Sequence, residues 1–210
     1  MARPVKEKFD VTRLRFVLLG LLVGLMSGTV VSAFRYCIEV GLRYSRLVYG
    51  HLRIAPFVWW QWALLIGVNL GLALIVAWLL KKETYISGSG IPQVEGQLAG
   101  ELEMHWWSIL WRKFIGGVLA LGPGLFLGRE GPSIQLGASV GQGLAAGFKL
   151  SGTDRRLLIA SGSAAGLAAA FNAPIAGTLF VLEEVYHNFS PLVWLTALAG
   201  AIGSVSYTHL

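Results

Sequence analysis

The chain has 210 residues, of which 55% are hydrophobic and only 13% are charged. A soluble domain of ordinary composition carries about 25% charged residues, so this composition excludes a typical soluble domain and indicates a membrane protein. The net charge of +6 reflects basic residues around apolar segments, which makes nucleic-acid binding a strained interpretation.

The first expected element is a membrane span over residues 16–33, an uncharged run about long enough to cross a hydrocarbon core of roughly 30 Å. A second span is expected over residues 58–80, with tryptophans at both ends as in an interfacial aromatic belt. Basic residues precede the first span: Arg3, Lys6, Lys8, Arg13 and Arg15. By the positive-inside tendency, residues 1–15 are therefore expected to form a cytoplasmic tail.

The later apolar segments, residues 134–148, 157–171, 173–185 and 191–205, are shorter. A helix of about 15 residues reaches only about 22 Å, so such helices begin or end inside the membrane. Exposed backbone at that depth is tolerated only when protein or a watery cavity surrounds it. Residues 16–205 are therefore expected to form one all-α, polytopic domain with tilted and membrane-interrupted helices.

Glycines at fixed spacing indicate close contacts between these helices. Gly20, Gly24 and Gly28 form a double GxxxG pattern, which lets two helix backbones approach. The same spacing recurs in three pairs: Gly67 and Gly71, Gly137 and Gly141, and Gly162 and Gly166.

Four segments share the pattern of a helix start, in which a small or polar residue precedes proline. They are GSGIPQ at 88–93, GREGPS at 128–133, FNAP at 171–174 and NFSPL at 188–192. Ser89, Asn172 and Ser190 are natural caps for the free amides. A helix start within a membrane gathers unpaired N–H groups and the positive end of the helix dipole, so it favours an anion. The alternative is that these are only capped helix ends in a bundle.

Glu130 lies at the second of these starts and is costly to place in a membrane. Its carboxylate is predicted to occupy the anion site as a tethered competitor, and to leave when it is protonated. The alternative is a neutralising ion pair with Arg129, although adjacent residues on a helix rarely face each other. A second pair of acids, Glu183 and Glu184, ends another apolar run, and one of them is predicted to collect protons for Glu130. The alternative there is two solvated acids at a helix end.

Enzymatic chemistry is not expected. The stretch around Gly128 lacks the GxxxxGK[ST] order of a phosphate loop, and no HExxH or Ser/His/Asp arrangement is present. The four histidines are scattered without ligand spacing, so no metal site is expected, and the single cysteine cannot form an intrachain disulfide. A purely structural membrane scaffold is a further alternative, against which Glu130 argues.

Three motifs in order resemble the CLC family of chloride channels and proton/chloride antiporters over most of residues 15–205. They are GSGIP at 88–92, GREGP at 128–132 and GLAAAFNAPIAGTLFVLEE at 166–184. The resemblance implies that Ser89 helps to coordinate chloride, that Glu130 is the gating glutamate, and that Glu184 is the internal proton-transfer residue. It also places Lys113 near the pathway. The implied chloride-binding residues are Gly88, Ser89, Gly90, Ile91, Pro92, Gly128, Arg129, Glu130, Gly131 and Pro132.

The resemblance implies proton-coupled chloride antiport in the cell membrane by a homodimer, with chloride and protons as transported species and no cofactor. The alternative is a gated chloride channel of the same fold without proton coupling. The family's GxFxP segment and second-half tyrosine are absent, so the chain is expected to be the N-terminal half of an inverted repeat. Residues 206–210 are expected to be a truncated end, and the 210 residues alone are expected not to form a closed pathway.

Overall fold

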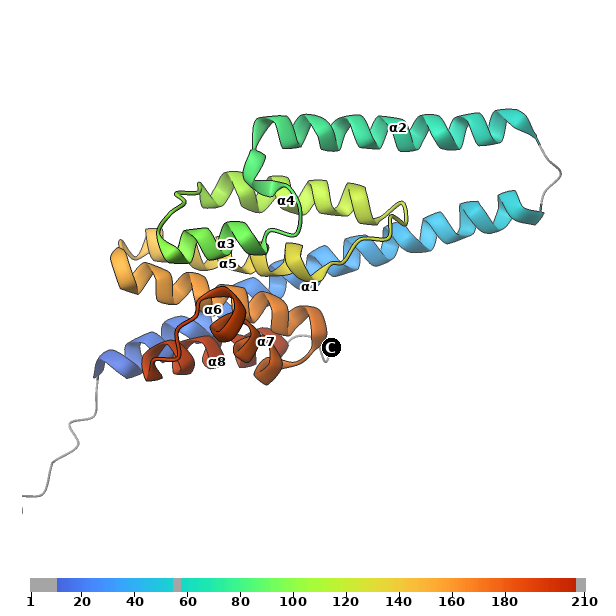
Figure 1. The fold of residues 1–210 in the computed structure, drawn as a ribbon. Helices are drawn as coiled ribbons and strands as arrows, with labels where there is room; N and C mark the ends of the chain where they lie inside the picture. The colour runs from blue at the N-terminus through green and yellow to red at the C-terminus, as the bar shows by residue number, and fades with distance from the viewer. Residues whose placement is uncertain (1–10, 55–57, 207–210) are drawn as a thin grey trace, which may run out of the picture.

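The computed structural model describes residues 11–54 and 58–206, and these residues form helices and connecting turns without any strand. In chain order the elements are α1 (Val11–Ile54), α2 (Trp59–Lys82), the 3-10 turn η1 (Thr84–Ile86), α3 (Ile91–Ala99), α4 (Trp106–Leu121), α5 (Glu130–Gly147), α6 (Gly152–Phe171), α7 (Pro174–Phe180), the π-helical turn η2 (Val181–Val185) and α8 (Pro191–Val205). Figure 1 shows α5, α6 and α8 stacked against α1, with α3 and α4 between this stack and α2. Two of the helices, α1 and α2, are long and apolar enough to cross a membrane.

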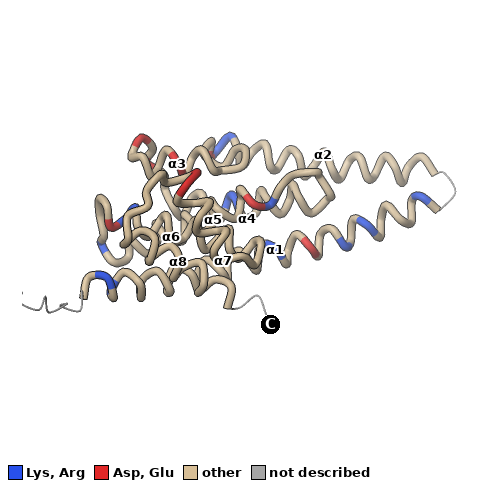
Figure 2. Tube along the Cα trace, turned by 60° about the horizontal axis from the view of Figure 1, so that its bottom comes forward, with Lys and Arg blue, Asp and Glu red and all other residues tan. Residues whose placement is uncertain are grey.

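The first helix is much longer than the predicted span over residues 16–33. It begins at Val11, inside the predicted tail, and continues to Ile54. Charged residues follow one another along its second half (Figure 2). Arg35, just past the predicted span, is held in the bundle, because its Nη1 donates to the Ala169 carbonyl in the last turn of α6 at 2.7 Å. Residues 1–10 and 207–210, which complete the predicted tail and truncated end, lie outside the described residues.

The glycine spacing correctly predicted a close helix contact along α1, and the structure shows that α8 is the partner. Gly20, Gly24 and Gly28 lie directly against the backbones of Thr196, Gly200 and Ser204, so a side chain at any of the three would overlap a carbonyl oxygen. Both helices therefore present small residues at four-residue spacing to each other.

The pairs Gly137 and Gly141 in α5 and Gly162 and Gly166 in α6 also form a close crossing. The Gly137 and Gly162 backbones touch each other, and Gly166 lies against the Ser133 carbonyl. In contrast, Gly67 and Gly71 in α2 have open space beside them within the described residues, so the prediction of close packing is wrong for this part of the chain.

The short apolar segments are helices, as predicted, with some changed limits. Helix α8 has the predicted bounds, whereas α6 begins five residues before the expected position 157. The segment predicted over 173–185 divides into α7 and the wider π turn η2, which carries Glu183 and Glu184.

The predicted helix starts are confirmed, but one of the predicted caps is wrong. Asn172 terminates α6 with a φ of 57°, and Ala173 is the N-cap residue of α7. Ser190 is the N-cap residue of α8, as predicted, but its side chain makes no capping hydrogen bond; its own amide donates to Asn188 Oδ1 at 2.9 Å.

Candidate anion-binding site

The starts of α3 and α5 meet at the centre of the described structure. The meeting is close because Gly131, in the first turn of α5, has no side chain: a Cβ there would lie 2.6 Å from the Ser89 carbonyl oxygen. Gly90 caps α3 with a φ of +94°, a conformation that glycine adopts without strain. Two of the four predicted helix starts are thereby brought together.

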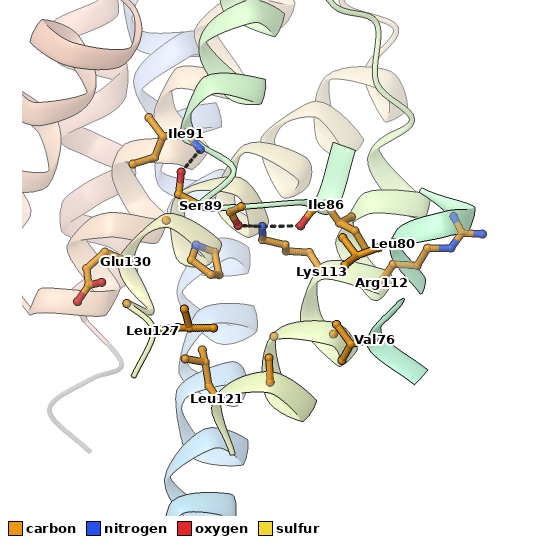
Figure 3. Close-up of a pocket in the computed structure, with 17 residues that line it drawn as sticks. Val76, Leu80, Ile86, Ser89, Ile91, Arg112, Lys113, Leu121, Leu127 and Glu130 are labelled. Atoms are coloured by element: carbon orange, nitrogen blue, oxygen red, sulfur yellow. Dashed lines mark hydrogen bonds between the residues drawn. The ribbon is translucent and has the colours of Figure 1, made fainter. Parts of the chain in front are cut away.

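A cavity of about 550 Å³ lies beside this meeting point. Its walls come from α2, η1, α4 and the two helix starts (Figure 3). The predicted site residues that line it are Gly88, Ser89, Ile91, Gly128, Glu130, Gly131 and Pro132, together with Lys113. Three predicted residues do not line it: Gly90, which packs on Gln135; Pro92, in the first turn of α3; and Arg129, which pairs elsewhere.

The Ser89 hydroxyl caps a first-turn amide of α3 and still has its own O–H to donate. Its Oγ accepts the Ile91 amide at 3.3 Å, as drawn in Figure 3. A hydroxyl that accepts through its oxygen retains one O–H to donate. Because Ser89 lines the cavity, that proton is available to a ligand there.

Lys113 is almost fully buried in α4, with 4% of its surface exposed. Its Nζ donates to the carbonyl oxygens of Ile86 and Gly88, both at 2.9 Å. The ammonium group therefore fixes the segment before Ser89 and places a positive charge at the cavity wall (Figure 3).

Glu130 is the first residue of α5, rather than the residue before the helix as the sequence predicted. It is half-buried and lines two cavities, the one beside Ser89 and a second of about 840 Å³ beside α1. Its carboxylate lies over Gly128 and is directed away from Ser89 and Lys113 (Figure 3). Glu130 thus stands at the boundary between the two spaces.

Arg129 forms its ion pair with Glu39 of α1, at 3.6 Å between Nη1 and Oε1. The alternative of an ion pair between Arg129 and Glu130 does not occur among the described residues. The second cavity is lined by a group of charged side chains from α1 and from the start of α5, namely Glu39, Arg43, Arg46, Arg129 and Glu130. Sequence reasoning missed this grouping because α1 is far from α5 along the chain.

Glu184 is exposed on η2, and it does not line the cavity that contains Ser89 and Glu130. In the described structure both acids are exposed, as in the alternative of two acids at a helix end. In the π turn Val181, Leu182 and Val185 face the interior, which leaves Glu183 and Glu184 on the outer side.

Lys113 supports a first prediction. In Lys113→Met the carbonyls of Ile86 and Gly88 lose their charged partner, and each such hydrogen bond contributes about 1.5–3 kcal/mol. We expect a lower thermal unfolding temperature in detergent. The exposed Lys81→Met in the same region is the control and is expected to leave that temperature unchanged. Equal unfolding temperatures for the two variants would contradict the assigned contacts.

The sequence model of the family described as voltage gated chloride channel matches residues 72–210, more than half of the chain. The chain belongs to this family. The resemblance indicated by the three motifs is therefore confirmed, and the two close helix starts are the structural setting of two of those motifs.

The chain is also similar in sequence to individual chloride transporters. The H(+)/Cl(-) exchange transporter ClcA of Salmonella arizonae is 38% identical over 184 residues, which cover 86% of this chain and 38% of the relative. ClcA of Vibrio cholerae serotype O1 is 40% identical over 195 residues, which cover 90% of this chain and 41% of the relative. The chain thus spans less than half of the length of these relatives.

The crystal structure of a slow cyanobacterial Cl-/H+ antiporter has the same fold over the shared region. Its TM-score is 0.82 at 36% identity, and the match covers 91% of this chain and 45% of the antiporter chain. The expected all-α CLC architecture is confirmed by this agreement. The membrane transporters among the relatives, together with the apolar helices α1 and α2, place the protein in a membrane.

Proposed function

We propose that this chain supplies the anion-binding half of a proton-coupled chloride transporter of the cell membrane. The observation that carries the proposal is the meeting of the α3 and α5 starts at one cavity, with Ser89 and Lys113 in its wall. The names of the relatives as exchange transporters and of the similar structure as an antiporter favour exchange over passive conduction.

The physical basis of anion binding is the sum of three positive contributions. Each helix start adds the positive end of its dipole and first-turn amides that have no partner within the helix. Pro92 and Pro132 carry no N–H, and Ser89 Oγ accepts the Ile91 amide, so the amides that remain at each start are fewer than in an ordinary helix. The Ser89 hydroxyl adds a donor, and the Lys113 ammonium adds a full charge. Gly88 and Gly128 line the cavity without side chains and are exposed, which leaves this part of the backbone accessible to a bare ion.

Glu130 is proposed as the gate. In the described position its carboxylate is clear of Ser89, and rotation about its side-chain bonds brings it toward the positive end of its own helix. An anion and the carboxylate then compete for one site. Protonation of Glu130 removes its charge, so the anion then occupies the site in place of the carboxylate. Binding of a proton to Glu130 is thereby coupled to the exchange of chloride. The cycle uses no cofactor.

Glu184 is proposed as the residue that delivers protons from the inner side of the membrane. Its exposure on η2 gives it access to water or to a neighbouring part of the protein. The basic residues before position 16 support a cytoplasmic N-terminus.

A homodimer is proposed for the assembled protein. Large apolar side chains are exposed on α7 and α8, including Ile175, Leu179, Phe180, Leu195 and Ile202. A second copy packed on these two helices would cover them.

A second prediction separates the exchanger from a channel of the same fold. In liposomes that contain the complete gene product, a chloride gradient is expected to drive uphill proton movement. Glu184→Gln is expected to reduce that proton movement to the level of protein-free liposomes while chloride flux persists, because the amide cannot carry a proton. The control is Glu183→Gln, the neighbouring exposed acid, which should leave coupling intact.

Two results would oppose this scheme in different ways. Chloride flux without any proton movement in the unmodified protein would identify a channel. Full coupling in Glu184→Gln would remove Glu184 from the proton route and leave antiport itself standing.

A further inference from the structure

The segment that carries Ser89 is held by an unusual set of hydrogen bonds. Four successive carbonyl oxygens, those of Tyr85, Ile86, Ser87 and Gly88, each accept a side-chain donor. The donors are Gln135 of α5 for Tyr85, Lys113 of α4 for Ile86 and Gly88, and Gln93 of α3 for Ser87. The negative ends of these carbonyls are therefore paired, which lowers their repulsion of an anion beside Ser89.

Gln135 differs from the other donors because it joins the two helix starts directly. It is buried, with 1% of its surface exposed, and its Nε2 donates to the Tyr85 carbonyl at 2.8 Å. Its side chain also packs on Gly90, the cap of α3: a Cβ at Gly90 would lie 2.5 Å from Gln135 Oε1. Within the part of the chain that the structure describes, Oε1 accepts no hydrogen bond.

The position of Gln135 within α5 explains why it acts on the site. Gly131 and Gln135 are four residues apart and so lie on the same face of the helix. Gly131 contacts Ser89 and Gln135 contacts Gly90, so one face of α5 sets the distance to two consecutive residues of the α3 start. The glutamine side chain occupies the space that Gly90 leaves open.

We propose that Gln135 is a positioning residue that sets the anion selectivity of the site, by fixing the spacing of the α3 and α5 starts and by pairing the Tyr85 carbonyl. This inference rests on the proposed function and adds a residue that the sequence motifs do not include. Gln135 does not line the cavity, so it acts through the Tyr85–Gly90 segment and not by touching the ion.

The same helix provides a matched control. Gln142 follows Gln135 by two helical turns and is also buried, with 5% of its surface exposed. Its Nε2 donates to the Met104 carbonyl and its Oε1 accepts from Gln97 Nε2, both at 2.6 Å. Like Gln135, it joins α5 to an earlier part of the chain through buried hydrogen bonds, but Ser89 and Gly90 are not among its described partners.

The experiment compares Gln135→Met and Gln142→Met in liposomes that contain the complete gene product. Methionine has a similar volume and no donor for a backbone carbonyl. Initial rates with chloride, nitrate and thiocyanate are measured at matched concentrations, and unfolding temperatures are measured in detergent. A lost neutral hydrogen bond at the site corresponds to a change of about three- to tenfold in preference.

We expect Gln135→Met to raise the nitrate-to-chloride and thiocyanate-to-chloride rate ratios by about three- to tenfold. The unfolding temperature is expected to change little, because the substitution also removes Gln135 Oε1, a buried oxygen that accepts no hydrogen bond in the described structure. Gln142→Met is expected to lower the unfolding temperature and keep the ratios of the unmodified protein, because it breaks two satisfied bonds away from the site.

The selectivity role of Gln135 would be overturned by unchanged rate ratios in Gln135→Met, or by an equal change of the ratios in both variants. In that case chloride transport by the unmodified protein would still support the proposed function. Absence of chloride transport in the unmodified protein would instead reject the proposed function. Gln135→Leu is the second variant, and failure of both substitutions at 135 to fold would show a requirement for folding and overturn the selectivity role.

Discussion

Glu130→Ala is expected to end proton coupling completely and to leave a chloride flux that no longer responds to pH. In the proposed scheme, alanine removes both the tethered competitor at the anion site and the group that binds the proton. In liposomes that contain the complete gene product, a chloride gradient should drive proton movement no faster than in protein-free liposomes. Chloride flux should persist, because the helix starts, Ser89 and Lys113 are untouched.

A matched acid tests whether the effect is specific to position 130. Glu95 lies on the exposed side of α3, where it pairs with His187 at 3.7 Å, and it does not line the cavity. Glu95→Gln should keep both the coupling and the pH response. Normal coupling in Glu130→Ala would refute the gate, and it would favour a structural role for this residue.

The second large effect is expected where α5 crosses α6. A Cβ at Gly137 would overlap the Gly162 carbonyl oxygen, a backbone atom that moves only with its helix. Gly137→Ala should therefore destabilise the fold by about 1–3 kcal/mol, the usual range for overpacking. The measurement is thermal unfolding in detergent, and the variant should also lose chloride flux because this crossing supports the start of α5.

Gly71→Ala is the control with the opposite expectation. No atom of the described structure lies within 4 Å of a Cβ at this position in α2. Alanine favours a helix over glycine by up to about 1 kcal/mol, so this variant should unfold at the same or a higher temperature. A similar loss of stability in the two variants would show that the crossing is looser than its glycines indicate.

Local chemistry explains the part of the structure that was predictable. Proline cannot donate a backbone hydrogen bond, so Pro92, Pro132, Pro174 and Pro191 marked four helix starts to within two residues. Glycines at four-residue spacing indicated a close helix contact at Gly24 without saying which helix supplies it. Ser89 and Glu130 were candidates from the sequence because they stand in these same segments, and both line the cavity at the two helix starts.

Contacts between distant parts of the chain explain what was not predictable. The hydrogen bond from Arg35 of α1 to the Ala169 carbonyl joins residues 134 positions apart, so it could not be read from the local sequence. The Arg129 ion pair with Glu39 has the same character. For Gln135 a signal was present, because a polar residue stood one turn after Gly131 in an apolar segment, but its meaning required knowledge of the Tyr85 carbonyl.

The contact of α1 with α8 has a consequence for biosynthesis. A ribosome delivers α1 to the membrane first, and more than a hundred residues pass before Gly200 emerges. During that interval the bare glycine face of α1 has only lipid or a chaperone as its neighbour. The α1–α8 contact therefore forms only after the helices between them have been made, so the packing of α1 is one of the later steps in the assembly of these residues.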